Sequence, residues 1–322
     1  MSDLDRYREV ITSFLLSLVP SRGLLRGLVG YPLGAVADDG DPGPGPGGKL
    51  LRPSLVLFAC EALGGDPERA LPLAAAVELV HTFSLVHDDI VDGDRVRRGR
   101  AAAWVVLGEH QAIHAGDGLL ALAFRTAAGA ALPERKTACA VEALASATLA
   151  MVEGQAWDLE LEGRPAATDE YLAMARGKTG ALLGCALELG AIAALRDELA
   201  LAHRRVGEDL GIAFQIRDDW LGLWGDPTVV GKAVGSDHAR GKRSYPIAWA
   251  LERDPSLARF LRDAPLAEVQ ARLAELGAPE ATEARAEELL AQAREGARNL
   301  PWPAWAQAEF AELCRGLSAR VK

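Results

Sequence analysis

Apolar residues recur three or four positions apart through most of the chain, the spacing that places them on one face of an α-helix. Ala and Leu dominate the composition, and alternating runs of β-branched residues are scarce. Helix breakers divide the pattern into segments at Gly64-Gly65, Gly163-Arg164-Pro165 and Gly225-Asp226-Pro227. The pattern predicts an all-α protein with roughly ten helices.

One low-complexity segment, DDGDPGPGPGG at residues 38–48, interrupts this pattern. Proline lacks a backbone N–H and glycine is conformationally free, so the segment fits neither a helix nor a strand and must be a loop. The residues before it are too few to bury a core of their own. We therefore expect a single domain over residues 1–322, with this loop inside it.

The segment Val77–Asp92 carries an apolar helical face that runs into acid. Helical spacing places Asp88 and Asp92 together at the end of that face, with Asp89 beside them. A basic run follows, with the residues Arg97, Arg98 and Arg100. Carboxylates suit Mg²⁺, which takes its other ligands from water and substrate phosphate, and guanidinium groups suit phosphate oxygens. The segment therefore predicts a site for a metal-bridged polyphosphate.

A second helical segment, from Leu210 onward, ends in the same way. Leu210, Phe214 and Asp218 lie four positions apart, so an apolar stripe again leads to paired carboxylates, Asp218 and Asp219. The sequence thus predicts two helices that end in paired carboxylates and can serve the same reaction.

Together these segments resemble the isoprenyl diphosphate synthase family, also called polyprenyl synthetases, over about residues 47–251. Each matching piece is weak alone, but their order and spacing are specific. The pieces are Gly47-Gly48-Lys49-Leu50-Leu51-Arg52-Pro53, His87-Asp88-Asp89-Ile90-Val91-Asp92, Arg97-Arg98-Gly99, Gly116-Asp117, Gly154-Gln155, Lys178-Thr179-Gly180, Phe214-Gln215-Ile216-Arg217-Asp218-Asp219 and Gly231-Lys232.

The resemblance implies an isoprenoid synthase fold, a bundle of antiparallel helices around a deep cavity, and a homodimer. It also implies a short-chain prenyltransferase that condenses isopentenyl diphosphate with an allylic diphosphate. Asp88, Asp89 and Asp92 would bind two Mg²⁺ ions, and Asp218, with Asp219 in the same motif, a third; Mn²⁺ would substitute.

By the same resemblance, two sets of residues hold the two substrates. The allylic diphosphate would be held by Arg97, Lys178, Lys232 and Lys242. Isopentenyl diphosphate would be held by Lys49, Arg52, His81 and Arg98.

The chemistry explains these residue types. Ionisation of the allylic carbon is assisted by whatever stabilises the departing diphosphate, a role for Mg²⁺, Lys and Arg. The allylic cation suits the ring of Phe214 and the oxygen dipoles of Thr179 and Gln215. In this family the released diphosphate is thought to remove the proton, so we name no general base.

Product length is expected to depend on Phe83 and Ser84, which precede Asp88 by slightly more than one turn and by one turn. A bulky Phe83 below a small Ser84 would stop elongation at a twenty-carbon geranylgeranyl product, or next at fifteen-carbon farnesyl. Alternatively, Phe83 faces a neighbouring helix as ordinary core.

One departure from the family pattern is Gly222, where the second motif commonly has a third Asp. Asp226 lies eight residues after Asp218, and whether it substitutes is open. A lost ligand keeps a non-catalytic regulatory subunit as an alternative. A class I terpene cyclase is a further alternative, although it needs an Asn or Asp with Ser or Thr and Glu in its second motif, and the only Asn in the chain is Asn299.

The formal net charge is −10, and no block of five or six Lys or Arg occurs, which argues against a nucleic-acid partner. The first residues, MSDLDRYREV, lack the basic start and apolar run of a signal peptide. The longest apolar stretch, from Gly180 to Leu195, is shorter than a membrane span of roughly 20 residues and predicts a buried helix. We expect a cytoplasmic protein without a transmembrane segment.

Other reactive residue types predict no chemistry. The cysteines lie far apart without a CxxC pair, so they are expected to fill the core. Four histidines share no ligand spacing and are expected to be structural or on the surface. Trp302 and Trp305 should pack the C-terminal segment. The cysteines and histidines are Cys60, Cys139, Cys185, Cys314, His110, His114, His203 and His238.

Overall fold

The computed structural model describes residues 3–164, 166–225, 238 and 240–318. The chain divides into two compact units, one of Asp3–Ala145 with Cys185–Leu201, the other of Ser146–Gly184 with Ala202–Lys322. Fifteen α-helices occur in the described residues, more than the ten expected, because several are too short to show a periodic signal. The boundaries between the units fall within α7 (Glu134–Glu160), α9 (Ala181–Ala193) and α10 (Ala200–Trp224).

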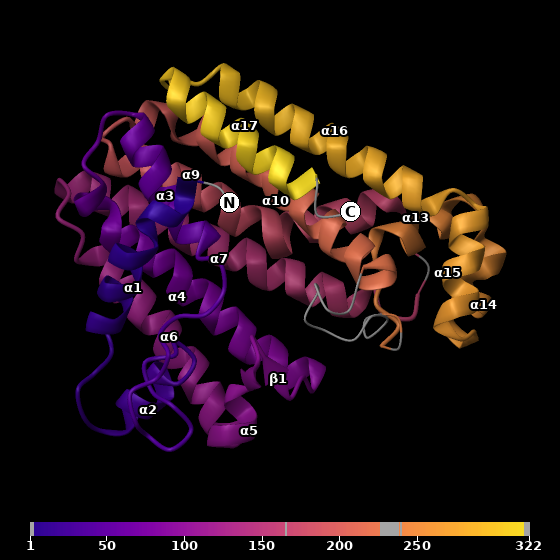
Figure 1. The fold of residues 1–322 in the computed structure, drawn as a ribbon, viewed down its shortest axis with the longest axis horizontal. Helices are drawn as coiled ribbons and strands as arrows, with labels where there is room; N and C mark the ends of the chain where they lie inside the picture. The colour runs from indigo at the N-terminus through magenta and orange to yellow at the C-terminus, as the bar shows by residue number, and fades with distance from the viewer. Residues whose placement is uncertain (1–2, 165, 226–237, 239, 319–322) are drawn as a thin grey trace. The chain divides into compact units, whose positions relative to one another are not determined.

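The first unit is built around α4, which packs against α6 and α3 (Figure 1). Asp66 caps the start of α4 by accepting a hydrogen bond from Glu68 N at 3.0 Å, and Gly93 ends it with φ 68°. The elements of this unit are η1 (Asp3–Tyr7), α1 (Arg8–Ser17), α2 (Leu24–Gly30), α3 (Leu51–Ala62), α4 (Pro67–Asp92), β1 (Val96–Arg97), β2 (Arg100–Ala101), α5 (Ala103–Leu107), α6 (Glu109–Ala128) and η3 (Asp197–Leu199). The predicted acidic end of Val77–Asp92 is therefore the last turn of a core helix.

The Pro/Gly segment is a loop, as predicted, but it is ordered by backbone hydrogen bonds. Gly45 N donates to Gly34 O at 2.8 Å, Gly43 N donates to Ala35 O at 3.0 Å, and Val36 forms an isolated bridge with Pro42. A Cβ at Gly34 would lie 2.0 Å from the oxygen of Gly45, so only glycine permits this approach.

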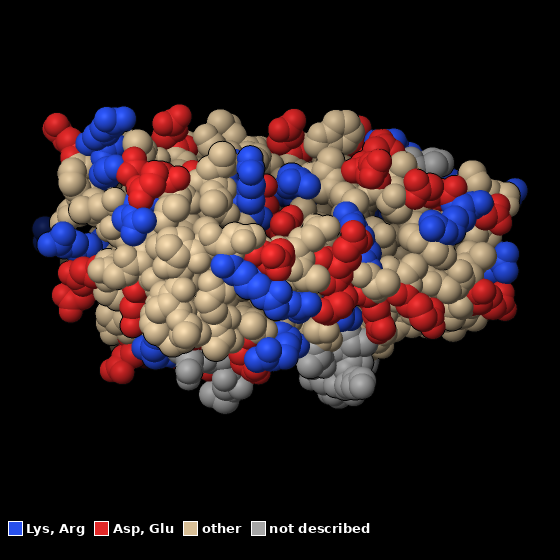
Figure 2. Space-filling view, turned by 90° about the horizontal axis from the view of Figure 1, so that it is seen from above, with Lys and Arg blue, Asp and Glu red and all other residues tan. Residues whose placement is uncertain are grey.

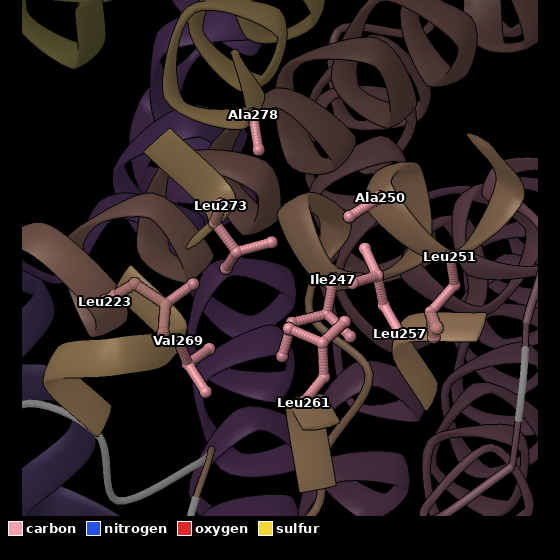
Figure 3. Close-up of a cluster of buried hydrophobic side chains, with 9 residues drawn as sticks. All are labelled: Leu223, Ile247, Ala250, Leu251, Leu257, Leu261, Val269, Leu273 and Ala278. Atoms are coloured by element: carbon pink, nitrogen blue, oxygen red, sulfur yellow. The ribbon is translucent and has the colours of Figure 1, made fainter. Parts of the chain in front are cut away.

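The second unit is anchored by a cluster of buried side chains from α10, α13, η4, α14, α15 and α16 (Figure 3). Leu223 of α10 and Ile247 of α13 belong to it, so the cluster fixes the start of α13. The elements of this unit are α8 (Thr168–Ala175), the π-helix η2 (Arg176–Gly180), α13 (Tyr245–Arg253), η4 (Pro255–Leu257), α14 (Ala258–Asp263), α15 (Leu266–Glu275), α16 (Ala278–Arg298) and α17 (Ala304–Ser318).

The residues predicted to have no chemistry lie in ordinary structural positions. His110 and His114 are exposed, and buried His203 accepts a hydrogen bond from Trp302 Nε1 at 3.0 Å. Trp302 packs against Phe310, as expected, whereas Trp305 is 42% exposed. All four cysteines are free thiols, and three of them are buried.

Two helices, α4 and α7, are long and apolar enough to cross a membrane by length and composition alone. The apolar part of α4 is 72% buried within the protein, as in a core helix, and that of α7 is 39% buried. The stretch from Gly180 to Leu195 forms α9 and is largely buried, as predicted. On the face in Figure 2, acidic and basic side chains of the described residues are interspersed.

Candidate active site

A basic cluster surrounds a buried carboxylate in the first unit. Arg52, in the first turn of α3, donates from Nη1 to His81 Nε2 at 3.2 Å. Arg98 Nη2 lies 3.8 Å from Glu78 Oε1, and Glu78 is 2% exposed. Three of the four residues predicted to hold isopentenyl diphosphate are thus brought together. Sequence reasoning missed Glu78, whose only signal was an acid inside the apolar run of α4.

The fourth residue, Lys49, is exposed on a tight turn before α3. Gly48 has φ 83° and the buried Leu50 has φ 49°, a left-handed conformation that is costly for a bulky residue. The guanidinium of Arg98 lies against this turn, donating to Gly47 O at 2.8 Å, and a Cβ at Gly48 would lie 2.9 Å from Arg98 Cζ. At Gly48 the positive φ favours glycine, and at Gly47 a Cβ would lie 3.2 Å from Arg98 Cδ, so a larger residue there would have to shift that side chain.

The ionisation of this cluster follows from burial. Burial lowers the pKa of His81 well below its ordinary value, and nearby Arg52, Arg98 and Arg97 lower it further. Arg52 can only donate, so Nε2 of His81 accepts and the imidazole proton is on Nδ1. Burial raises the pKa of Glu78 although Arg98 and Arg52 oppose that shift. A neutral His81 therefore accompanies the basic residues.

The run after α4 forms a β-hairpin, which the sequence had not predicted. Arg97 pairs with Arg100 across the two strands, and the turn residues Arg98 and Gly99 have φ 52° and 76°. Such two-residue turns usually carry Asn-Gly or Asp-Gly, so Arg-Gly gave no signal. The hairpin directs Arg97 to Asp89, donating from Nε to Oδ1 at 2.8 Å.

The three carboxylates of the first motif differ in exposure. Asp89 is 3% exposed and bonded to Arg97, whereas Asp88 and Asp92 are half-buried. Among the described residues no three His, Cys, Asp or Glu side chains form a group that could hold a metal ion. Mg²⁺ is commonly bound by one or two carboxylates with phosphate and water, and the oxygen donors of Asp88 and Asp92 fit that requirement.

A pocket of about 330 Å³ lies within the first unit, between the Pro/Gly loop, α4 and the hairpin. Its lining includes Asp89, Arg97 and Arg98 beside the apolar side chains of Leu85 and Val86. Guanidinium groups next to apolar walls suit a small anion with a short hydrocarbon part.

The residues predicted to set product length lie one turn deeper in α4. Phe83 is 8% exposed and packs edge-on against the ring of His87, with ring centroids 5.0 Å apart. Ser84 donates from Oγ to His81 O at 2.8 Å. His87 Nε2 lies 3.2 Å from Ile113 O of α6, so Phe83 is held beside that helix pair.

In the second unit a hydrogen-bonded chain joins three elements. Thr179 of η2 donates to Gln215 Oε1 at 2.6 Å, and Gln215 Nε2 donates to Asp219 Oδ1 at 3.0 Å. The backbone N of Tyr245, at the start of α13, donates to Asp219 Oδ2 at 2.8 Å. Because Thr179 donates to Gln215, its oxygen lone pairs are free to face elsewhere.

Asp218 and Asp219 are therefore not equivalent. Asp218 is exposed, while both oxygens of half-buried Asp219 accept hydrogen bonds. Lys232 and Asp226 lie outside the described residues, and Gly222 follows Asp218 by one turn of α10.

Two further predicted residues, Lys178 and Lys242, meet at one carboxylate. Asp158 Oδ2 accepts from Lys178 Nζ at 2.5 Å and from Lys242 Nζ at 3.5 Å. Burial would raise the pKa of Asp158, but the two lysines outweigh it and hold that pKa below its ordinary value. Sequence reasoning missed Asp158, although it follows Gly154 by one helical turn in α7.

Comparisons with known proteins identify the family of this chain. The model of the family described as Polyprenyl synthetase matches residues 43–274. The geranylgeranyl diphosphate synthase of Mycobacterium tuberculosis is 46% identical over 226 residues, which cover 70% of this chain and 64% of that relative. The chain thus spans under two thirds of the length of this curated relative.

Solved structures with a similar fold cover nearly the whole chain. The polyprenyl synthetase from Streptomyces coelicolor has a TM-score of 0.89 and 34% identity, covering 97% of this chain and 98% of that one. The polyprenyl synthase from Caulobacter crescentus, complexed with calcium and isoprenyl diphosphate, has a TM-score of 0.85 and 30% identity, covering 99% and 97%. The fold is the predicted all-α isoprenoid synthase fold, and the chain belongs to the polyprenyl synthetase family.

Proposed function

We propose that this chain is a short-chain prenyltransferase that condenses isopentenyl diphosphate with an allylic diphosphate. The observation that carries the proposal is the grouping of Arg52, His81 and Arg98 around Glu78, in a chain that belongs to the polyprenyl synthetase family. That cluster supplies cationic and neutral donors to one small anion. The name of the M. tuberculosis relative supports a geranylgeranyl product, with farnesyl as the alternative.

In this proposal the basic cluster, with exposed Lys49, binds and orients isopentenyl diphosphate. The neutral imidazole of His81 donates from Nδ1 to a phosphate oxygen, while Arg52 and Arg98 provide charge. Orientation of the double bond toward the allylic carbon replaces an encounter in solution, which is the main advantage of holding two substrates together.

Lys178, Lys242, Arg97 and Lys232 hold the allylic diphosphate. Thr179 and Gln215 present oxygen dipoles to the developing allylic cation, with the hydroxyl of Thr179 oriented by its bond to Gln215. The ring of Phe214 helps to exclude water. The diphosphate leaves the allylic carbon, the isopentenyl double bond forms the new carbon–carbon bond, and the proton passes to the released diphosphate.

Asp88, Asp92 and Asp218 are the carboxylates that would hold Mg²⁺, and Asp89 and Asp219 complete the same motifs. Bound Mg²⁺ would neutralise the charge that develops on the departing diphosphate. The proposal also includes three Mg²⁺ ions, substitution by Mn²⁺, a homodimer, a single domain over residues 1–322 and a cytoplasmic location.

The test is incubation of the purified full chain with Mg²⁺, isopentenyl diphosphate and dimethylallyl, geranyl or farnesyl diphosphate, with products identified by mass. We expect released diphosphate and a prenyl diphosphate of fifteen or twenty carbons, and no product after chelation of the metal. A chain inactive by itself, with or without Mn²⁺, would contradict the proposal and favour a regulatory subunit. A hydrocarbon formed without isopentenyl diphosphate would favour a cyclase.

A further inference from the structure

A short approach between two backbones places Asp158 beside Lys178. A Cβ at Gly154 would lie 2.1 Å from the backbone N of Lys178, and a Cβ at Gly177 would lie 2.7 Å from Ala150 O. Glycine at both positions therefore allows α7 to touch η2. Asp158 lies one turn after Gly154, so its short side chain reaches the ammonium group of Lys178.

The same carboxylate joins a third segment that is distant in sequence. Lys242, just before α13, reaches the same oxygen of Asp158 as Lys178. At 2.5 and 3.5 Å from that oxygen, the two ammonium nitrogens lie no more than about 6 Å apart. Two ammonium groups so close repel each other unless an anion lies between them. Because both side chains are largely buried, water screens this repulsion only weakly.

A side chain one turn earlier on α7 has no hydrogen-bond partner within the described part of the protein. Gln155 lies three residues before Asp158, and both the nitrogen and the oxygen of its amide are buried without a hydrogen-bond partner. A buried amide without partners is unfavourable, and such groups commonly mark a site completed by a ligand or water.

We propose that Asp158 is a positioning residue, whose carboxylate holds Lys178 and Lys242 together so that both ammonium groups bind one diphosphate. This inference rests on the proposed function. Asp158 carries one negative charge against two positive charges, so the group keeps a net positive charge for an incoming anion. Asp158 itself does not contact the reacting atoms; it acts through the two lysines.

Three variants test this role. Asp158→Asn keeps the shape but loses the charge, and Asp158→Glu keeps the charge on a longer side chain. Because two unneutralised lysines could unfold the protein, the double variant Asp158→Asn/Lys242→Met restores the original net charge of the group. Asp169→Asn, the same change at an exposed position in α8, is the matched control.

The measurements are KM for each substrate and calorimetric binding of inorganic diphosphate without turnover. We expect Asp158→Asn and the double variant to raise KM for the allylic diphosphate by about tenfold or more, with KM for isopentenyl diphosphate changed less than about twofold. Diphosphate binding should weaken in parallel, Asp158→Glu should recover part of the loss, and Asp169→Asn should match the wild type. In a Lys178→Met background, Asp158→Asn should add little, because one acts through the other.

Folded variants that bind diphosphate like the wild type, or that raise both KM values equally, would overturn the inference. Full additivity with Lys178→Met would also overturn it. If the wild type binds diphosphate in an Asp158-dependent manner but forms no prenyl product, the proposed function fails and the positioning role stands.

Discussion

Arg97 donates a hydrogen bond from Nε to Oδ1 of Asp89 at 2.8 Å. Asp89 is buried at this contact, whereas its neighbours Asp88 and Asp92 are half-buried. Arg97 also lies 3.4 Å from Asp94, in the short connection between α4 and the hairpin, so it contacts one carboxylate on α4 and one just after it. The central acid of the motif therefore has a structural partner, while the two outer acids are more accessible.

This difference predicts that Asp88 and Asp89 fail in different ways. Asp88→Asn should lower kcat/KM by at least about a thousandfold, because it removes stabilisation of charge in the transition state, with little change in stability. Asp89→Asn should lower the free energy of unfolding by about 2 kcal/mol through its charged hydrogen bond, with a smaller loss of activity. Kinetics and urea denaturation of both variants check this; equal losses of activity would contradict it.

Arg52 should act on one substrate only. Its contact with His81 places it in the basic cluster, so Arg52→Ala should raise KM for isopentenyl diphosphate far more than KM for the allylic substrate. Arg52→Lys should also be damaging, since a lysine cannot reproduce the planar fork of donors. Arg69→Ala, an exposed arginine on α4, provides the control. The reverse pattern of KM values would show that the two substrate sites are interchanged.

Stability should depend on pH through His81. Burial, with Arg52, Arg98 and Arg97, holds its pKa below the ordinary value of 6.5, so the unfolded chain binds more protons than the folded one below that pH. The contribution of neutral His81 to the free energy of unfolding is therefore complete above pH 6.5 and is lost as the pH falls below that value. The melting temperature of His81→Gln should fall less between about pH 7.5 and 5.5 than that of the wild type. His110→Gln, at an exposed position, should follow the wild type; an equally steep fall in His81→Gln would refute the prediction.

Product length should respond to Phe83 and Ser84. If the growing chain passes Ser84 and stops at the ring of Phe83, Phe83→Ala should lengthen the product and Ser84→Phe should shorten it. Chromatography and mass measurement of the products decide this. If the distribution of product lengths is unchanged and Phe83→Ala lowers the free energy of unfolding by about 3 kcal/mol or more, Phe83 is ordinary core beside His87.

Gly222 tests whether the second motif is complete. Gly222 lies one turn after Asp218, so an Asp at this position would face the same side of α10. If Asp218 and its neighbours suffice, Gly222→Asp should change the rate of product formation only modestly. A gain of several orders of magnitude would mean that the natural chain lacks an essential ligand and would favour the regulatory subunit.

The sequence by itself determined the features that depend on local spacing. The helical class follows from apolar residues three or four apart, and the acidic ends of α4 and α10 follow from carboxylates at the same spacing. The loop over residues 38–48 follows from Pro and Gly, which exclude regular structure. Each of these depends on residues within a few positions of one another, so no tertiary contact is needed to predict it.

Only the tertiary structure decided which groups hold the individual acids. Asp89 is held by Arg97 through a hairpin with an unusual turn, and Asp219 is held by Gln215 and the backbone of Tyr245. Asp158 and Glu78 look like ordinary acids in the sequence, and their partners come from other segments: Asp158 meets lysines 20 and 84 residues away. Such contacts depend on close helix packing, which glycines such as Gly154 permit, and a one-dimensional pattern does not contain that geometry.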